Sequence, residues 1–439
     1  MDDEPNDRLV ETEIGVLPSS WRLCRFDELF DSKLGKMLSQ KARLGSAPRP
    51  YLRNANVQWS RVDVSDLLEM DFSEDEQERF RLVCGDILIC EGGEVGRTAI
   101  WRGQLEECYF QKAIHRARPI NGAMDSEFFM YHMMNSFLIQ NTYGTQGTET
   151  TIAHLPAVKL KALLVPAPPI EEQRAIARLL RTVQQAKEAT EKAVAAARQL
   201  KQSIMRHLFT YGPVPVEEAD RVPLKETDFG AVPEMWKTIP LSDCAVVQTG
   251  VAKGRKLDGA DAVSVPYLRV ANVQDGYLDL SEMKNIDIRR SELSRYSLQP
   301  GDVVLTEGGD FDKLGRGFIW NGEVPGCVHQ NHVFAVRADR RLLVPEFLAY
   351  LTQSPYGKAY FLSVAHKTTN LACINTTKLK AFPTLVPPKN EQKEIAGCLS
   401  AVDAKIGREE AKRNALDCLF KSLLHKLMTG KLRVAGEES

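Results

Sequence analysis

The sequence has no long hydrophobic run and almost no net charge. No stretch of its 439 residues approaches the roughly eighteen apolar residues that a membrane-spanning helix needs. The first ten residues, MDDEPNDRLV, are acidic and polar, so we expect no secretory signal peptide and no membrane association. The formal net charge of −1 gives no overall attraction to nucleic acid, so a DNA-binding surface would depend on local clusters of basic side chains.

Disulfide patterns and the common catalytic motifs are also missing. The nine cysteines include no C-x-x-C pair, which is typical of reduced thiols in a cytosolic protein. There is no G-x-G-x-x-G after a predicted strand, no P-loop, and no Asn/Asp-Pro-Pro-aromatic loop of the kind that amino-methyltransferases use. We therefore expect neither catalytic residues nor a bound cofactor in this chain.

The sequence does contain a tandem repeat that covers most of its length. Three motifs recur in the same order: Gly15–Trp21 and Gly230–Trp236, Pro50–Val57 and Pro266–Val273, and Gly85–Ile89 and Gly301–Leu305. The last pair continues in both copies into Glu-Gly-Gly. Because the repeat is much longer than a solenoid unit, it predicts two similar globular domains.

The spacing between the copies changes within one glycine-rich segment. Gly96 and Gly315 are further apart than Gly85 and Gly301, because the second copy has three extra residues between these positions. The flanking runs are apolar and β-branched, which predicts a strand, a loop and a strand. Loop tips accept changes of length and often carry function, so we expect a shared scaffold that differs at this tip.

Each copy ends in a run with the heptad pattern of a long helix. The first run has one seam at Ile176, Val183, Thr190, Ala197 and Ile204, and a second seam at Leu179, Ala186, Ala193 and Leu200. The second run begins its first seam at Ile395, the counterpart of Ile176, and charged residues interrupt its pattern at Lys405, Glu409 and Lys412. These charges would either weaken the packing in the middle of the helix or contact a partner protein. The first helix, from about Glu171 to Phe209, would be about 58 Å long, and each helix is expected to lie along the other.

The predicted order is therefore domain, helix, domain, helix. The boundaries are residues 1–169 for the first domain, 170–212 for the first helix, 213–387 for the second domain, 388–432 for the second helix and 433–439 for a tail. Short helical stretches are predicted within the domains around Glu127–Gln140 and Pro345–Ser354, and Pro213–Glu218 is predicted to be a stiff hinge between the halves. Two unequal domains and a long spacer suggest that each domain reads one half of a split DNA target.

Taken together, these motifs resemble the specificity subunit of type I restriction–modification systems. The resemblance is carried by the repeat, the Gly-Asp strand before Glu-Gly-Gly, Gln-Lys-Ala-Ile at 111–114, the Lys-Leu-Lys stretches and the Pro-Pro-x-x-Glu-Gln helix openings, from about residue 15 to residue 432. It implies an α+β fold with two target-recognition domains of mixed α/β structure, and two long helices that pair as an antiparallel coiled coil. We expect the Ile176 end to lie against the Leu423 end.

The resemblance also implies sequence-specific binding of double-stranded DNA without catalysis. The partners that it implies are two modification (methyltransferase) subunits and restriction (endonuclease/translocase) subunits, in the cytoplasm of a prokaryote. S-adenosylmethionine, ATP and Mg²⁺ would belong to these partners. Two alternatives stay open: a coiled-coil scaffold whose domains bind no DNA, and a fused restriction–modification enzyme, which the missing catalytic motifs disfavour.

Candidate DNA-binding residues come from polar positions in the repeated motifs. They are Arg53, Asn54, Asn56, Arg97, Gln111, Lys112, His115 and Thr150 in the first copy, and Arg269, Asn272, Arg316, Gln330, His332, Lys367 and Thr369 in the second. Arginine and asparagine suit guanine and adenine edges. A segment as similar in both copies as Arg53–Asn56 and Arg269–Asn272 nevertheless favours scaffold or phosphate contact over base readout.

The other candidates have competing interpretations. Arg97 and Arg316 fit DNA contact or a solvated hairpin equally well. Gln111 and Gln330 are shared, which favours a structural or backbone-binding role, whereas the unlike neighbours Lys112, His115 and His332 could read bases. The hydroxyls around Thr150 and Thr369, beside Lys367, suit phosphates or a capping loop.

A zinc site is the remaining possibility in the second copy. Cys327, His329 and His332 could form half of such a site, but Phe110 and Ala113 take the histidine positions in the first copy. We therefore expect no metal ion here and histidines that face solvent or are hydrogen-bonded.

Overall fold

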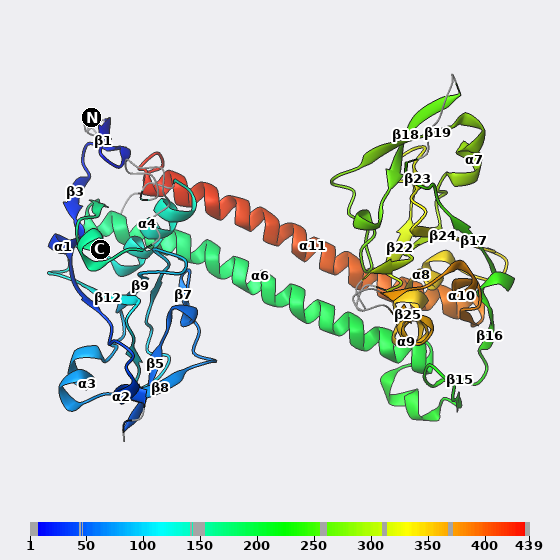
Figure 1. Ribbon diagram of the computed structural model, residues 1–439, viewed down its shortest axis with the longest axis horizontal. Coiled ribbons are helices and arrows are strands. Elements are labelled where there is room, and N and C mark those ends of the chain that lie inside the picture. Colours follow the sequence, from blue (N-terminus) through cyan, green and yellow to red (C-terminus); the bar gives the residue numbers. More distant parts are fainter. Residues whose placement is uncertain are drawn as a thin grey trace, which may run out of the picture. The chain divides into compact units, whose positions relative to one another are not determined.

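The computed structural model describes residues 8–43, 45, 47–140, 143, 154–254, 261–309, 314–367 and 372–434 (Figure 1). The chain divides into two compact units: unit 1 is Met1–Glu191 with Ala411–Ser439, and unit 2 is Lys192–Glu410. Each unit thus contains the globular domain of one copy of the repeat and part of both long helices.

The division between the units falls inside the long helices. The expected hinge at Pro213–Glu218 lies within unit 2, where Val216–Arg221 forms the 3-10 helix η2. The ring Nε2 of His207 and the carbonyl oxygen of Val214 are hydrogen-bonded at 2.8 Å, which holds this segment against the end of the preceding helix. The proline-rich segment is therefore packed inside one unit and does not separate the two.

Unit 1 is built around two sheets. The four-stranded antiparallel sheet has the order β10 (Thr98–Ile100), β9 (Ile87–Cys90), β12 (Ile114–Pro119), β4 (Phe30–Leu34). The three-stranded sheet has the order β11 (Tyr109–Phe110), β5 (Pro48–Leu52), β8 (Leu68–Asp71). Three strand pairs accompany them: β1 (Leu9–Thr12) with β2 (Gly15–Pro18), β3 (Arg22–Arg25) with β13 (Leu164–Ala167), and β6 (Val57–Gln58) with β7 (Arg61–Val62).

The helical elements of unit 1 connect and cover these strands. They are α1 (Phe26–Leu29), α2 (Gln40–Arg43), the 3-10 helix η1 (Asn54–Asn56), α3 (Glu74–Phe80), α4 (Ser126–Leu138) and α5 (Ala157–Lys161). The expected strand, loop and strand around Glu-Gly-Gly are β9 and β10, and the helical stretch expected near Glu127–Gln140 is α4. Strand β13 lies between α5 and the long helix, an element that the Lys-Leu-Lys stretch had not indicated.

Unit 2 repeats the same topology. Its four-stranded sheet is β22 (Gly317–Trp320), β20 (Asp302–Thr306), β24 (Val333–Ala338), β17 (Ala245–Thr249), and its three-stranded sheet is β19 (Lys284–Arg289), β18 (Ala262–Leu268), β23 (Val328–His329). The pairs are β14 (Leu224–Lys225) with β15 (Val232–Pro233) and β16 (Lys237–Pro240) with β27 (Pro383–Val386). A further sheet joins β21 (Gly308–Gly309), β26 (Ala372–Cys373) and β25 (His366–Lys367).

The helical elements of unit 2 follow the same plan with more turns. Besides η2, they are η3 (Leu241–Asp243), η4 (Val270–Asn272), η5 (Arg290–Glu292), α7 (Leu293–Tyr296), α8 (Pro345–Gln353), α9 (Pro355–Val364) and α10 (Thr376–Lys380). Helix α8 corresponds to the stretch expected at Pro345–Ser354.

The central strand of each four-stranded sheet is buried on both faces. In β9, Ile87 and Ile89 pack into one core with α4, whereas Leu88 and Cys90 pack into a second core with the three-stranded sheet. The same alternation places Val303 and Val304 of β20 in different cores. Successive side chains of a strand point to opposite faces, so burial on both sides explains the unbroken apolar run in this motif.

The Gly-Asp motif before this strand anchors an ion pair whose carboxylate is buried and whose guanidinium is partly exposed. Both carboxylate oxygens of Asp86 bind the Arg118 guanidinium, at 2.5 and 3.0 Å, and only 1% of the Asp86 side chain is exposed. Asp302 and Arg337 repeat the arrangement at 2.7 Å for both bonds. The motif is thus part of the scaffold shared by the two units.

Two long helices, α6 (Ile170–Tyr211) and α11 (Lys389–Met428), complete both units (Figure 1). Their antiparallel pairing is confirmed. In unit 1, Lys187 of α6 pairs with Asp417 of α11 at 2.5 Å; in unit 2, Lys201 pairs with Asp403 at 2.7 Å. The Ile176 end meets the Leu423 end in the core of unit 1, as expected.

The first predicted seam is correct, but the second is displaced by one residue. Leu180 and Val194 are buried at 0% and 4% exposure, whereas Leu200 of the predicted second seam is 51% exposed. The second seam therefore lies four residues after the positions of the first seam, whereas the sequence had placed it three residues after them. With this register Lys405 and Lys412 lie on the exposed face of α11 and do not interrupt its seam.

Within the described residues, no helix is both long enough and apolar enough to cross a membrane.

Candidate nucleic-acid interface

In unit 1, three separate loops meet at the Glu-Gly-Gly turn (Glu91–Gly93). The backbone nitrogen of Glu91 donates to the carbonyl oxygen of Ala113 at 2.9 Å, and Leu155 N donates to Glu91 O at 2.7 Å. The side-chain amide of Asn54 donates to Gly92 O at 2.9 Å. The turn thus gathers the segments that follow β5, β9 and β11, together with the residues just before α5.

Unit 2 forms the same junction at its own Glu-Gly-Gly turn (Glu307–Gly309). Glu307 N donates to His332 O at 2.9 Å, and Ile374 N donates to Glu307 O at 2.8 Å. Segments that are far apart in the sequence are therefore brought together at equivalent places in both units. We take these two loop clusters as the candidate interfaces.

Asn56 and Asn272 hold the loop beside each turn. The Asn56 side chain is 3% exposed; its Oδ1 accepts from Arg53 N, and its Nδ2 donates to the carbonyl oxygens of Asp63 and Asp66, each at 2.9 Å. Asn272 makes the three equivalent bonds at 2.8 to 3.1 Å. Their polar groups are therefore used to fix backbone, and base contact by these two residues stays a prediction that this burial disfavours.

The neighbouring arginines are also engaged within the protein. The Nη2 of Arg53 contacts the Asp66 carboxylate at 2.5 Å, and the Nη2 of Arg269 donates to Glu282 O at 2.7 Å. Only 26% and 15% of these side chains remain exposed. Whether they also contact phosphates stays a prediction.

Arg97 and Arg316 hold the β9–β10 and β20–β22 loops against the same segment. Arg97 donates to Asn54 O at 2.6 Å and contacts Glu94 at 3.2 Å, and 12% of its side chain is exposed. Arg316 donates to the Gln274 side chain at 3.2 Å. Neither Arg97 nor Arg316 is therefore the solvated hairpin arginine that the sequence had left as an alternative.

The glycines of this loop allow an aromatic ring to approach. A Cβ on Gly96 would lie 2.4 Å from the Phe137 ring, and one on Gly315 would lie 2.4 Å from the Phe361 ring. Both glycines have positive φ, 78° and 62°. This close approach and the left-handed backbone explain why glycine occurs at both positions.

The Gln111–His115 segment divides into inward and outward positions. Gln111 N donates to Leu52 O at 3.1 Å, and the Lys112 side chain is exposed beside it. His115 is 1% exposed, its Nε2 lies 2.9 Å from Leu155 O, and burial lowers its pKa. From this buried position His115 supports the loop cluster, so base reading by its ring is disfavoured.

The corresponding residues of unit 2 are differently placed. Gln330 is 9% exposed, whereas the His332 side chain is 56% exposed and its Nδ1 contacts the Glu307 carboxylate. His332 thus lies on the surface of the turn, where a ligand can reach it.

Some predicted residues cannot be placed. Thr150 and Thr369 lie outside the described residues. Lys367 belongs to strand β25, but its side chain is likewise outside the described part.

The possible half zinc site is used for internal hydrogen bonds instead. The Cys327 thiol donates to Val328 O at 3.3 Å, and burial raises the pKa of this thiol to about 12. The Nδ1 of His329 lies 2.6 Å from Val333 O, while His332 contacts Glu307. Within the described residues no cluster of three or more histidine, cysteine, aspartate or glutamate side chains could hold a metal ion.

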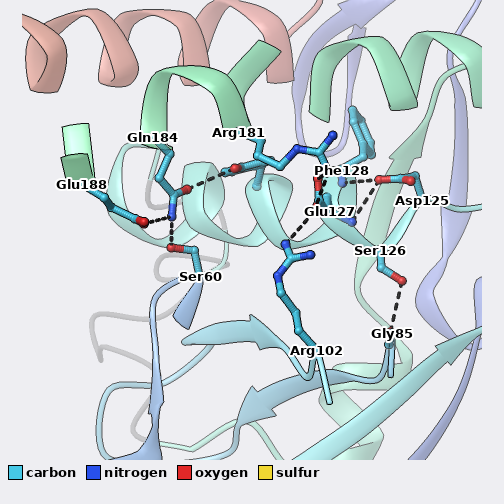
Figure 2. Close-up of polar contacts among 11 residues, drawn as sticks. Ser60, Gly85, Arg102, Asp125, Ser126, Glu127, Phe128, Arg181, Gln184 and Glu188 are labelled. Atoms are coloured by element: carbon cyan, nitrogen blue, oxygen red, sulfur yellow. Dashed lines mark hydrogen bonds and ion pairs between the residues drawn. The ribbon is translucent and has the colours of Figure 1, made fainter. Parts of the chain in front are cut away.

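The sequence did not reveal a polar network that joins α4 to α6 in unit 1. Glu127 lies between Arg102, at 2.5 Å, and Arg181, at 3.1 Å (Figure 2). Gln184 lies one turn further along α6 and contacts Ser60 beside the candidate interface. The one sequence signal for this network is that Tyr131 and Tyr350 occupy equivalent places in the two copies. In the structure their hydroxyls donate to Gln184 of α6 and to Asp403 of α11.

Comparison with known proteins agrees with this architecture. The family model of the type I restriction modification DNA specificity domain matches residues 18–197 and 233–417. The type I restriction enzyme StySPI specificity subunit of Salmonella potsdam is 24% identical over 435 residues, which cover 95% of this chain and 90% of that protein. The putative type I restriction enzyme MjaX specificity subunit of Methanocaldococcus jannaschii is 28% identical over 208 residues, which cover 47% of this chain and 48% of that protein.

A solved structure shares the fold over nearly the whole chain. The crystal structure of the S subunit of a type I restriction–modification system from M. genitalium superposes with a TM-score of 0.56 at 15% identity, covering 97% of this chain and 98% of that chain. This likeness extends to both domains and both long helices. The chain therefore belongs to the type I restriction–modification DNA specificity family, and its two matched domains make it a specificity subunit with two target-recognition domains.

Proposed function

We propose that this chain reads a bipartite DNA target, with one half-site bound by the loop cluster of each unit. The long helices act as the spacer that fixes the gap between the half-sites. The chain catalyses no reaction itself; it directs methyltransferase subunits, and through them restriction subunits, to the target. S-adenosylmethionine, ATP and Mg²⁺ are assigned to those partners.

One observation supports this proposal above the others. The two loop clusters have the same scaffold, pinned by Asn56 and Asn272 and by the paired Glu-Gly-Gly turns. Their surface positions differ: Ala113 is replaced by the exposed His332, and Trp59 by Asp275. A common scaffold with different tips is what two readers of unlike sequences require, because scaffold and phosphate contacts position the protein while differing side chains specify bases.

A binding assay with the full chain and its modification subunits tests the proposal. Duplexes carrying the target should be shifted at lower protein concentration than scrambled duplexes, and the affinity should fall as salt rises because bound phosphates release counterions. Equal affinity for target and scrambled DNA at every salt concentration would contradict the proposal and would favour a scaffold protein that does not read DNA.

A further inference from the structure

We propose that Gln184 of the spacer helix α6 is a positioning residue for target reading by unit 1. Through Ser60 it holds the β6–β7 turn (Val57–Val62) in place beside the Glu-Gly-Gly turn. The inference rests on the proposed function, because it gives Gln184 a role only if unit 1 reads DNA.

The side chain of Gln184 uses both its amide hydrogens and its carbonyl oxygen in hydrogen bonds, and it connects α6, α4 and the β6–β7 turn. Its Nε2 donates to Ser60 Oγ at 2.6 Å and to Glu188 Oε1 at 3.0 Å, and its Oε1 accepts from the Tyr131 hydroxyl at 3.1 Å. Figure 2 shows Gln184 above Ser60, with Glu188 on the next turn of α6. Since both amide hydrogens and the carbonyl oxygen are used, the side chain has one favoured orientation, and the turn is tied to both α4 and α6.

The same turn continues directly into the candidate interface. Ser60 Oγ donates to Trp59 O at 2.6 Å, and the Trp59 indole donates to Glu94 Oε1 at 2.9 Å. Glu94 in turn contacts Arg97 at 3.2 Å, within the loop that differs in length between the units. A shift of Ser60 would therefore move Trp59 and the Glu94–Arg97 pair, which belong to the surface assigned to DNA.

Unit 2 uses the equivalent node for a different purpose. Asp403 occupies the position equivalent to Gln184; it accepts from the Tyr350 hydroxyl at 2.8 Å and pairs with Lys201 at 2.7 Å. Its contacts thus join α8 and the two long helices. Glycine, Gly276, replaces Ser60 there, so no hydroxyl is available to be held.

The turn of unit 2 is instead tied to α9. Asp275, in the place of Trp59, pairs with Lys358 at 2.6 Å. The two units therefore position the same turn in different ways, and within the described residues a hydrogen bond from the spacer helix to this turn occurs in unit 1 only. A change at Gln184 or Ser60 should accordingly affect the reading of one half-site and leave the other unchanged.

The test uses the full chain with its modification subunits and a set of duplexes with single base-pair changes at every target position. The variant Ser60→Gly removes the hydroxyl at a residue with φ of 59°, a conformation that glycine adopts without strain. We expect discrimination against wrong base pairs to fall roughly two- to ten-fold at one half-site, the effect of losing about one hydrogen bond. Gln184→Met should lower discrimination at the same half-site.

Asp403→Asn is the matched control, because Asp403 occupies the equivalent position but makes its described contacts with Tyr350 and Lys201 and not with the turn. Its discrimination profile should match the wild type at both half-sites. If Ser60→Gly matches the wild type, or loses discrimination equally at both half-sites, the positioning role is wrong while the proposed function stands. If the wild-type complex itself shows no discrimination, the proposed function fails, and the inference fails with it.

Discussion

The side-chain oxygen of Gln173 accepts a hydrogen bond of 2.8 Å from the backbone nitrogen of Asp125, the residue that caps the N-terminus of α4. Its amide also donates to the carbonyl oxygens of Ala123 and Pro168, at 3.1 and 2.8 Å, and the side chain is fully buried. Gln392 makes the same three bonds in unit 2. The glutamine of each helix opening thus fixes the start of a long helix against its recognition domain.

The preceding glutamate links this opening to a second repeated motif. Glu172 accepts from the Trp21 indole at 3.3 Å, and Glu391 accepts from the Trp236 indole at 2.9 Å. The tryptophan motif at the start of each copy and the Pro-Pro-x-x-Glu-Gln motif at its end therefore meet in space. Both are architectural, and this explains why they are alike in the two copies of the repeat.

Replacing Gln173 by leucine should destabilise the protein by about 2 to 3 kcal/mol, because buried backbone groups lose their partners. Glu171→Gln is the control, since Glu171 is 51% exposed and pairs with Arg174 on the same helix turn; it should change stability by under about 0.5 kcal/mol. Urea denaturation measures both. Equal effects of the two variants would show that Gln173 is not an anchor.

Breaking the ion pair of the Gly-Asp motif, whose carboxylate is buried, should cost more than breaking a pair whose carboxylate is exposed. Arg118→Met leaves the Asp86 carboxylate, 1% exposed, without its counter-ion, and we expect a loss of about 3 kcal/mol. Arg49→Met breaks the Arg49–Glu107 pair, in which both side chains are more than a third exposed, and should cost under about 1 kcal/mol. Thermal unfolding of both variants decides whether burial makes this difference.

Stability should fall as the pH is lowered because of His132. Burial lowers the pKa of His132 to about 3, from an ordinary value of 6.5, and its Nε2 lies 2.8 Å from the Tyr143 hydroxyl. Because the pKa of His132 is lowered in the folded state, the unfolded chain binds the proton more readily than the folded chain. The contribution of His132 to the stability of the fold is therefore fully present above about pH 6.5 and is lost progressively below it.

The leucine variant of His132 tests this, because Leu351 occupies the equivalent position in unit 2. His132→Leu should weaken the pH dependence of stability between pH 6.5 and pH 4 by about one proton per molecule. Denaturation curves for both proteins across that range provide the measurement. Parallel pH profiles would mean that His132 is not the group responsible.

Lys112 should act on DNA affinity without altering sequence preference. Its side chain is exposed beside the Glu-Gly-Gly turn, and a lysine that contacts a phosphate contributes about one unit to the slope of log K against log salt. Lys112→Gln should therefore reduce that slope by about one, and binding to all sequences should weaken together. Lys192→Gln, at an exposed position of α6, is the control and should leave the slope unchanged.

The tandem repeat made much of the fold predictable. Two aligned copies located the strands around Glu-Gly-Gly, helices α4 and α8, and the paired long helices, because repeated motifs separate scaffold from local variation. The second seam was misplaced because Leu179 and Leu180 are both apolar, and Leu200 continues the wrong register. Periodicity alone does not distinguish steps of three from steps of four when both positions can be filled.

The site was only partly predictable. The sequence provided candidates in the segments around residues 53, 97 and 111 without placing them together, and the fold brings these segments to one turn. It did not indicate that Asn56 or His115 would be buried, because burial depends on which neighbouring loop covers each residue. Nor did it reveal Gln184, whose partners Ser60 and Tyr131 are distant in sequence and come together only when α4 packs on α6.

Mapping the methylated bases in cells that express the complex tests the central claim most directly. The experiment compares the wild type with a chain carrying four added residues in each long helix, after Glu191 and after Glu410, where the compact units divide. We predict a split target with one fixed gap in the wild type and a gap about two base pairs wider in the variant, since four residues add about 6 Å. A contiguous target, or an unchanged gap with methylation intact, would contradict the claim that the paired helices set the distance between two DNA readers.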